Sequence, residues 1–359
     1  MRCLIILLAA TAAFGQISRE TQSSNTTEDL RGVSVVSTKV AWASGTHGTY
    51  VRTTDAGRTW TAAQVPNEAS LDFRGVVAFS ADEAFLMSSG PGEASRIYHT
   101  SDGGRNWELQ LTDKNPKGFF DSIALWDRTH GVVLGDPVPD ESGQLKFQLF
   151  ITEDGKSWNP IPPSQLPPAV EGEGAFAASN SCLAILRPPD SNIWFATGGR
   201  VARVFHSADR GKTWEVFDTP INHGHDSAGI YSVTFRDPLH GVIAGGDYKH
   251  PDEDGPNLAF TNDGGKKWSI SQIFPQSYYS AVAYDRKFRS PKAAERDEDR
   301  AHMRLFIVNP KFVFDFRPPA NPTRISPPGK SSIRFNAVSP YPTGGALFVG
   351  PKGSVATVP

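Results

Sequence analysis

The chain has 359 residues, and its 36 Lys and Arg are balanced by 38 Asp and Glu, which gives a formal net charge of -2. This balance argues against a nucleic-acid-binding protein, because such a surface carries an excess of clustered cations. Hydrophobic residues make up only 38% of the chain, whereas Gly and Pro are frequent, with 33 and 28 copies. The composition favours a loop-rich all-β domain.

The first 15 residues have the pattern of a secretory signal peptide. Arg2 is followed by an apolar run from Cys3 to Phe14 and by a small-residue cleavage site near Gly15. The run is short for a transmembrane helix and no other long apolar run follows, so we expect a soluble periplasmic or extracellular protein without stable membrane insertion. Cys3 is not placed as a lipid-attachment site. Cleavage would leave Cys182 as the only cysteine, which excludes an intramolecular disulfide.

A short phrase recurs five times along the chain: Ser or Thr, then Asp two residues later, then Gly, and finally Trp. The hydroxyl and the carboxylate can bond turn amides, Gly supplies a positive φ, and Trp anchors the turn in apolar packing. Each copy predicts a stapled β-hairpin turn whose Asp is structural, because a catalytic carboxylate is expected only once. The residues are Asp55 and Trp60, Asp102 and Trp107, Asp154 and Trp158, Asp209 and Trp214, and Asp263 and Trp268; the third copy is one residue shorter.

A second marker recurs seven times and consists of a bulky apolar residue, any residue, and a small residue. Its copies begin at Leu30, Phe73, Phe120, Phe176, Ile230, Tyr279 and Phe335, with spacings of 43 to 56 residues. Such spacings are typical of four-stranded propeller blades. We therefore predict an all-β fold, a single seven-bladed β-propeller over residues 16–359, in which each marker begins the inner strand of a four-stranded antiparallel blade.

The chain also indicates how the ring closes. After Phe335 only two further strands are evident, so the last blade is one strand short. Residues 16–22 precede the first marker at the place where a missing strand is needed. We predict that this N-terminal strand closes the last blade and removes two exposed sheet edges.

The five turns resemble the Asp-box (BNR) repeat, S/T-x-D-x-G-x-x-W, of propellers such as sialidases, sortilin-type receptors and the photosystem II stability and assembly factors of the Ycf48/HCF136 family. The leader, the boxes and the ring together resemble this last family over residues 16–359. The resemblance implies a non-enzymatic propeller that binds a protein partner, such as an envelope membrane complex, and acts as an assembly factor.

One face of the predicted ring is the better candidate for binding. The loops that join second to third strands, and those that join one blade to the next, share this face, while the repeated turns lie on the other. Long polar loops on a rigid ring are where propellers usually bind ligands. We expect no catalytic residue, no cofactor and no metal, since His223, His225 and Asp226 match no metal signature. The predicted binding face comprises Arg31, Arg74, Asp121, Asp136, Glu173, His225, Tyr231 and Asp247.

Two alternatives stay open. A sialidase-type glycoside hydrolase needs an Arg clamp, a nucleophile and an acid. Arg31, Arg74 and Arg200 could form the clamp, and Tyr231 or Tyr279 with Glu173 the nucleophile pair. The Arg-Ile-Pro element of sialidases is absent, however, and seven blades depart from their six. The second alternative is a module that binds a glycan or a peptide without catalysis.

Overall fold

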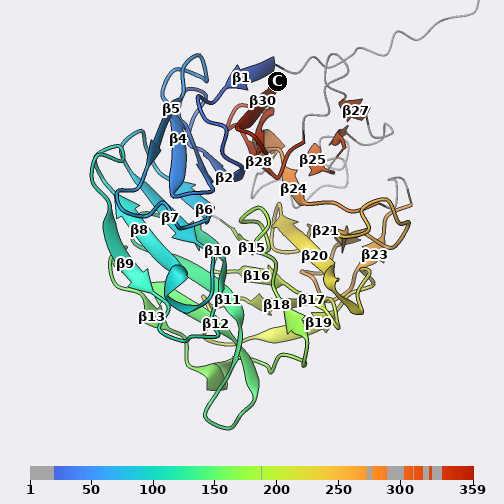
Figure 1. Ribbon diagram of the computed structural model, residues 1–359. Coiled ribbons are helices and arrows are strands. Elements are labelled where there is room, and N and C mark those ends of the chain that lie inside the picture. The colour runs from blue at the N-terminus through green and yellow to red at the C-terminus, as the bar shows by residue number, and fades with distance from the viewer. Residues whose placement is uncertain are drawn as a thin grey trace, which may run out of the picture.

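The computed structural model describes residues 20–186, 188–272, 277–288, 303–309, 311–317, 323–325 and 334–359. Their strands form seven antiparallel sheets around a common axis, as Figure 1 shows. These residues contain no α-helix, only 3-10 turns at Gly92–Ala94, Pro163–Gln165 and Arg286–Phe288. The predicted all-β seven-bladed propeller is therefore confirmed. The signal peptide expected at residues 1–15 lies outside the described residues.

Blades are numbered in chain order. Blades 1 to 3 comprise β2 (Leu30–Val35), β3 (Ala41–Gly45), β4 (Thr49–Thr53) and β5 (Thr61–Gln64); β6 (Phe73–Ala78), β7 (Ala84–Ser88), β8 (Arg96–Thr100) and β9 (Glu108–Thr112); and β10 (Phe120–Leu125), β11 (Gly131–Pro139), β12 (Leu145–Thr152) and β13 (Asn159–Pro160). Blades 4 and 5 comprise β15 (Leu183–Ile185), β16 (Ile193–Ala196), β18 (Arg203–Ser207) and β19 (Glu215–Asp218); and β20 (His225–Phe235), β21 (Gly241–Asp247), β22 (Leu258–Thr261) and β23 (Ser269–Ile270). Blades 6 and 7 comprise β24 (Ala281–Tyr284), β25 (Leu305–Val308), β26 (Val313–Phe316) and β27 (Thr323–Ile325); and β28 (Ala337–Pro340), β29 (Ala346–Gly350), β30 (Ser354–Val358) and β1 (Glu20–Ser23). Two short strands, β14 (Glu173–Gly174) and β17 (Gly198–Gly199), extend the sheet of blade 5.

Burial between blades explains the strand sequences. The second strands, such as β7 and β16, are buried along their whole length, whereas the outer strand β5 is exposed at both ends. A blade packs both of its faces against neighbours, so its middle strands need apolar residues on both sides. Between blades 1 and 2 this core contains Trp42, Phe73 and Leu86. The apolar runs of the sequence are therefore blade-to-blade contacts.

The N-terminal strand closes the ring, as predicted. β1 pairs antiparallel with β30, with Thr21 opposite Ala356 and Gln22 opposite Val355. In Figure 1 the blue N-terminal strand therefore lies beside the red C-terminal blade. Among the described residues the strand begins at Glu20.

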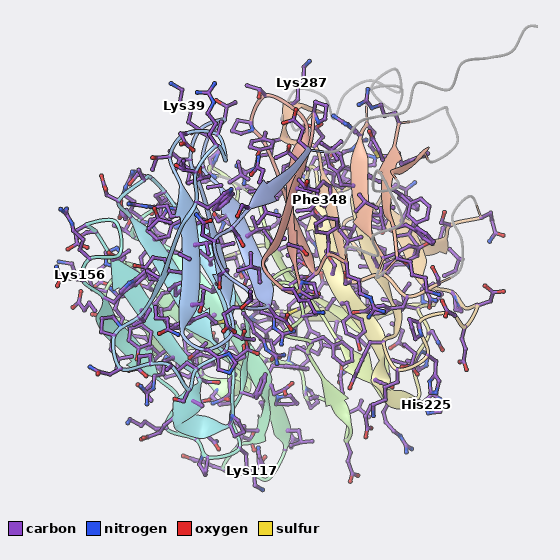
Figure 2. All side chains as sticks on the ribbon, turned by 45° about the horizontal axis from the view of Figure 1, so that its top comes forward. Lys39, Lys117, Lys156, His225, Lys287 and Phe348 are labelled. Atoms are coloured by element: carbon purple, nitrogen blue, oxygen red, sulfur yellow. The ribbon has the colours of Figure 1, made fainter. Side chains whose placement is uncertain are left out.

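The propeller has two distinct faces. The loop face carries the loops between second and third strands and the links between blades, such as residues 113–119; the Asp-box face carries the repeated turns between third and fourth strands. In Figure 2, Lys117 and His225 lie toward the loop face, and Lys39, Lys156 and Lys287 lie toward the Asp-box face.

The marker at Phe176 does not begin an inner strand, and this part of the prediction was wrong. β15 begins only at Leu183. Residues 175–181, called the channel plug below, instead enter the central channel: Ala177 O accepts from Arg74 of blade 2, and Ser179 Oγ donates to Ser280 O of blade 6. Neither blade adjoins blade 4, so only a segment on the axis can contact both. The plug takes the place of a longer inner strand in blade 4.

Candidate binding site at the channel mouth

Four inner strands carry a β-bulge at the same level, near the loop face. The register shifts at Arg31 in β2, Arg74 in β6, Asp121 in β10 and Tyr231 in β20. A bulge leaves one residue without a cross-strand partner and redirects its side chain. These four residues, all predicted for the binding face, surround the loop-face end of the channel, here called the channel mouth.

The small residue of the marker is explained by close packing behind the bulge. A Cβ on Gly32 would lie 2.8 Å from Arg74 O, and one on Gly75 would lie 2.8 Å from Asn180 Oδ1. A side chain would not fit at these two positions. In β2, β6, β10 and β20 the marker therefore coincides with a bulged inner strand.

Arg31 and Arg74 share one carboxylate, that of Asp72. Arg74 Nε donates to Asp72 Oδ2 at 2.8 Å, and Arg31 Nε lies 3.5 Å from Asp72 Oδ1. The two arginine side chains keep 28% and 30% of their surface exposed. Two guanidinium groups against one carboxylate leave N–H donors facing the mouth. Asp72 was missed at the sequence level, although it directly precedes the marker at Phe73.

Asp121 and Asp136 form an acidic pair on the other side of Arg74. Asp121 is 1% exposed, and neither of its carboxyl oxygens has a hydrogen-bond partner among the described residues. Burial, with a contribution from Asp136, raises the pKa of Asp121 well above its ordinary value, against the opposing effect of Arg74. Burial also raises the pKa of Asp136 to about 6, although Asp136 Oδ1 accepts the Ala175 N–H at 2.9 Å.

Tyr231 belongs to an aromatic cluster beside the plug. Its ring stacks on Phe176 with centroids 4.0 Å apart, and its hydroxyl donates to Ser227 O at 2.7 Å. Burial raises the pKa of Tyr231 far above its ordinary value, so the hydroxyl stays neutral. The edges of Tyr248 and Tyr278 contact the same ring, and Tyr248 is 50% exposed on the loop face.

The remaining predicted residues lie on the loop face of blades 4 and 5. Glu173 is buried and bound by Arg203 and by the Thr197 hydroxyl. Burial opposes ionisation of Asp247, but hydrogen bonds from His250, Ser227 and the Lys249 amide hold its pKa below the ordinary value. These two carboxylates therefore stabilise their own loops. His225 is exposed where β20 begins.

These contacts do not favour a sialidase-type site. Arg31 and Arg74 converge on Asp72, and the bonds of Tyr231 and Glu173 are directed to Ser227 and Arg203 instead of to each other. Within the described part of the chain, no group of three or more His, Cys, Asp and Glu side chains is arranged to hold a metal ion.

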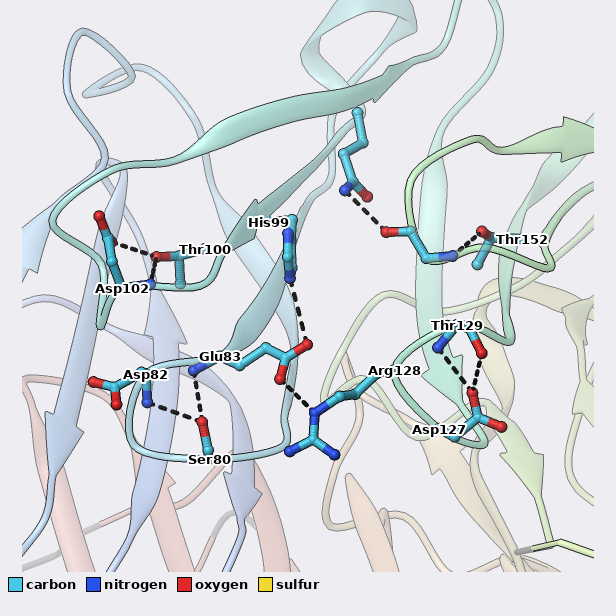
Figure 3. Close-up of polar contacts among 12 residues, drawn as sticks. Ser80, Asp82, Glu83, His99, Thr100, Asp102, Asp127, Arg128, Thr129 and Thr152 are labelled. Carbon is cyan, nitrogen blue, oxygen red and sulfur yellow. Dashed lines mark hydrogen bonds and ion pairs between the residues drawn. The ribbon is translucent and has the colours of Figure 1, made fainter.

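The box carboxylates are engaged within their own turns. Asp102 accepts the Asn106 N–H at 2.9 Å and the Thr100 hydroxyl at 3.0 Å, the latter drawn in Figure 3. In the short third box, Asp154 accepts from the Lys156 and Ser157 amides. The hydrogen bond from the Asn106 amide to Asp102, and that from the Ser157 amide to Asp154, hold each pKa at about 2. The missing residue therefore shifts the accepted amides without removing them.

Four of the five box tryptophans are anchored by a hydrogen bond from Nε1, in two ways. Trp60 and Trp158 donate from Nε1 to Gln22 and Gln110 of the preceding blade, at 2.9 and 3.1 Å. Trp214 and Trp268 donate to a carbonyl of their own box. The first pair thus links neighbouring blades, and the second closes its own turn.

The fold and the repeated turns define the class: the chain is an Asp-box β-propeller. Within this class it is similar to the Ycf48 proteins. The family model for photosynthesis system II assembly factor YCF48 matches residues 12–137. The photosystem II assembly protein Ycf48 of Synechococcus sp. (strain JA-2-3B'a(2-13)) is 24% identical over 54% of this chain and 62% of its own length.

Two further proteins show the same likeness. The photosystem II assembly lipoprotein Ycf48 of Synechococcus sp. (strain CC9902) is 22% identical over 68% of this chain and 63% of its own length, so the chain spans less than two thirds of both relatives. A solved structure of YCF48 bound to D1 peptide superposes with a TM-score of 0.64 at 15% identity, covering 95% of this chain and 96% of that one. At this identity the superposition shows a shared fold. In the described ranges no helix is long and apolar enough to cross a bilayer.

Proposed function

We propose that the protein is a non-enzymatic propeller that binds an extended segment of a partner protein at the channel mouth and assists assembly of a membrane complex. The Ycf48 likeness supports this, since one such protein binds a D1 peptide. The expected signal peptide, together with a relative that is a lipoprotein, supports a periplasmic or extracellular location.

The observation that carries the proposal is the exposed arginine pair above a closed channel. The plug lies across the channel, bonded to blade 2 and to blade 6, so the binding groups at the mouth face the loop side. Within the described part of the chain, Asp72 engages one nitrogen of Arg31 and one of Arg74. Arg74 Nη1 is also engaged, by Ala177 O, and the other N–H groups of the two arginines suit the carbonyl and carboxylate oxygens of a peptide. Tyr248 adds an exposed ring beside them, and aromatic and Arg side chains dominate binding energy at protein interfaces.

The test is affinity capture from a cell-envelope extract with the mature protein as bait. The variant Arg31→Ala with Tyr248→Ala removes two partly exposed side chains from the loop face, and Lys39→Ala with Lys156→Ala is the matched control on the Asp-box face. We expect a membrane-protein partner that the control retains and the mouth variant binds at least about tenfold more weakly, as loss of a central interface side chain predicts.

Two results would contradict the proposal. A partner retained by the mouth variant but lost by the control would move the interface to the Asp-box face. Turnover of a sialoside or another glycan by the intact protein would identify an enzyme instead.

A further inference from the structure

Asp121 differs from the other residues of the channel mouth because it is sealed from solvent and has no hydrogen-bond partner in the described structure. An ionised carboxylate in such a place is strongly disfavoured, because it is 1% exposed and no described residue donates a hydrogen bond to it. The burial of Asp121 and its lack of a hydrogen-bond donor in the described structure therefore favour the neutral carboxylic acid. The raised pKa of Asp121 agrees with it.

The elements packed around Asp121 place two charged groups and one thiol near it. β6 contributes Arg74, the loop-face end of β11 contributes Asp136, and the end of the plug leads into Cys182, whose buried thiol has a raised pKa and is neutral. On its own strand the next side chain is the Ser122 hydroxyl. A charge on Asp121 would therefore attract the Arg74 guanidinium and repel the Asp136 carboxylate.

Both charged neighbours also hold the channel plug. Arg74 Nη1 donates to Ala177 O at 3.2 Å, and Asp136 Oδ1 accepts the Ala175 N–H at 2.9 Å. A third attachment lies directly after Asp121, where Asn180 Oδ1 accepts the Ile123 N–H at 2.8 Å. The plug is thus attached at the two groups that would respond to a charge on Asp121.

We propose that Asp121 is a proton-sensitive latch on the channel plug: its neutral carboxyl keeps residues 175–181 in the channel, and loss of its proton to solvent loosens them. A carboxylate here attracts Arg74 away from Ala177 O. It also repels the Asp136 carboxylate from its position on the Ala175 amide. Rising pH therefore opens the floor of the mouth.

Amide hydrogen exchange measured by NMR between pH 5 and pH 8 tests the latch without any partner. The Ile123 and Val233 amides report on the plug, because they donate to Asn180 Oδ1 and Ser181 O. Each rate is divided by that of an unstructured peptide at the same pH. In the unaltered protein we expect the equilibrium constant for plug opening to rise about tenfold or more over this range. A tenfold rise corresponds to an Asp121 pKa about one unit lower in the open state than in the closed state. In Asp121→Asn this rise is absent, because ionisation of Asp136 near pH 6 only strengthens its bond to the Ala175 N–H.

Asp113→Asn is the matched control. Asp113 is also buried, and burial raises its pKa, but it lies in the link between blades 2 and 3. Within the described structure its carboxylate accepts from Asn115 and Gln148, neither of which belongs to the plug. This variant should keep the pH dependence of the unaltered protein. Asp121→Ser is a second neutral variant in case Asp121→Asn does not fold. Opening that does not rise with pH in the unaltered protein, or a rise that persists in the neutral variants, overturns the proposal.

Discussion

At the scale of single residues, Asn180 shows how one side chain joins the plug to the inner strand of blade 3. Its Oδ1 accepts the Ile123 N–H and the Ser122 hydroxyl, and its Nδ2 donates to Ile123 O at 3.1 Å. The amide thereby pairs with the open edge of the blade 3 inner strand as another strand would. Its backbone has φ of 58°, which Asn tolerates better than most residues.

Asn180→Ala should lower the free energy of unfolding by about 2–4 kcal/mol, because buried backbone groups of Ile123 lose their partners and Ala is strained at positive φ. Chemical denaturation measures the loss. Asn67 has a similar φ of 66° but is exposed, so Asn67→Ala should cost only the backbone part, about 1 kcal/mol. Equal losses for both variants would show that the Asn180 side chain contributes nothing.

At the scale of elements, the Asp-box is a hairpin turn in which the Asp carboxylate accepts hydrogen bonds from backbone N–H groups of the turn. In full copies the accepted amide is four residues after the Asp, as in Asp209 with Thr213, and in the short copy the amides are two and three residues after Asp154. The motif therefore tolerates a deletion because only the acceptor must be retained.

The box carboxylates should make stability depend on pH in the acid range. The folded pKa of Asp102 is about 2, below its ordinary value, so its contribution is complete above about pH 4 and is lost as pH falls to about 2. Asp102→Ala should lower the melting temperature at pH 7 by a few degrees and leave it unchanged near pH 2. Calorimetry across this range measures the difference.

Asp82→Ala is the control, because this exposed carboxylate of the same face pairs only loosely with Arg52, at 3.8 Å. It should change the melting temperature little at any pH. A difference for Asp102→Ala that persisted at pH 2 would mean that the carboxylate charge is not what stabilises the turn.

At the scale of the whole molecule, closure depends on the last strand. β30 pairs with both β1 and β29, and the C-terminal Pro359 O accepts from Arg304, which is itself held by Asp285 and Asp315. Because each blade supports its neighbours, an opening at this point exposes apolar faces on both sides of the gap.

Deletion of residues 354–359 should abolish cooperative thermal unfolding. Loss of the buried Val355 and Val358 alone removes about 3–6 kcal/mol, a large part of the stability of a typical domain. Deletion of the exposed hairpin tip, residues 141–143, is the control and should retain a single transition. A cooperative transition in the C-terminal deletion would show that the ring does not need β30.

The fold and much of the mouth were predictable from sequence because their signals are local. Each Asp-box is a turn of eight residues or fewer, and the marker with Arg31, Arg74, Asp121 and Tyr231 records a bulge within one strand. The marker at Phe176 was misleading, because Phe176 does not begin a strand. Its ring stacks on Tyr231 of blade 5.

The sequence by itself determined the class, the number of blades and the strand that closes the ring, since repeats and strand counts are properties of neighbouring residues. Only the tertiary structure decided that residues 175–181 enter the channel, that Asp72 joins two arginines, and that Asp121 has no hydrogen-bond partner among the described residues. The reason is physical: hydrogen bonds and desolvation at the axis depend on which blades meet there, and residues distant in sequence meet only when the ring is complete.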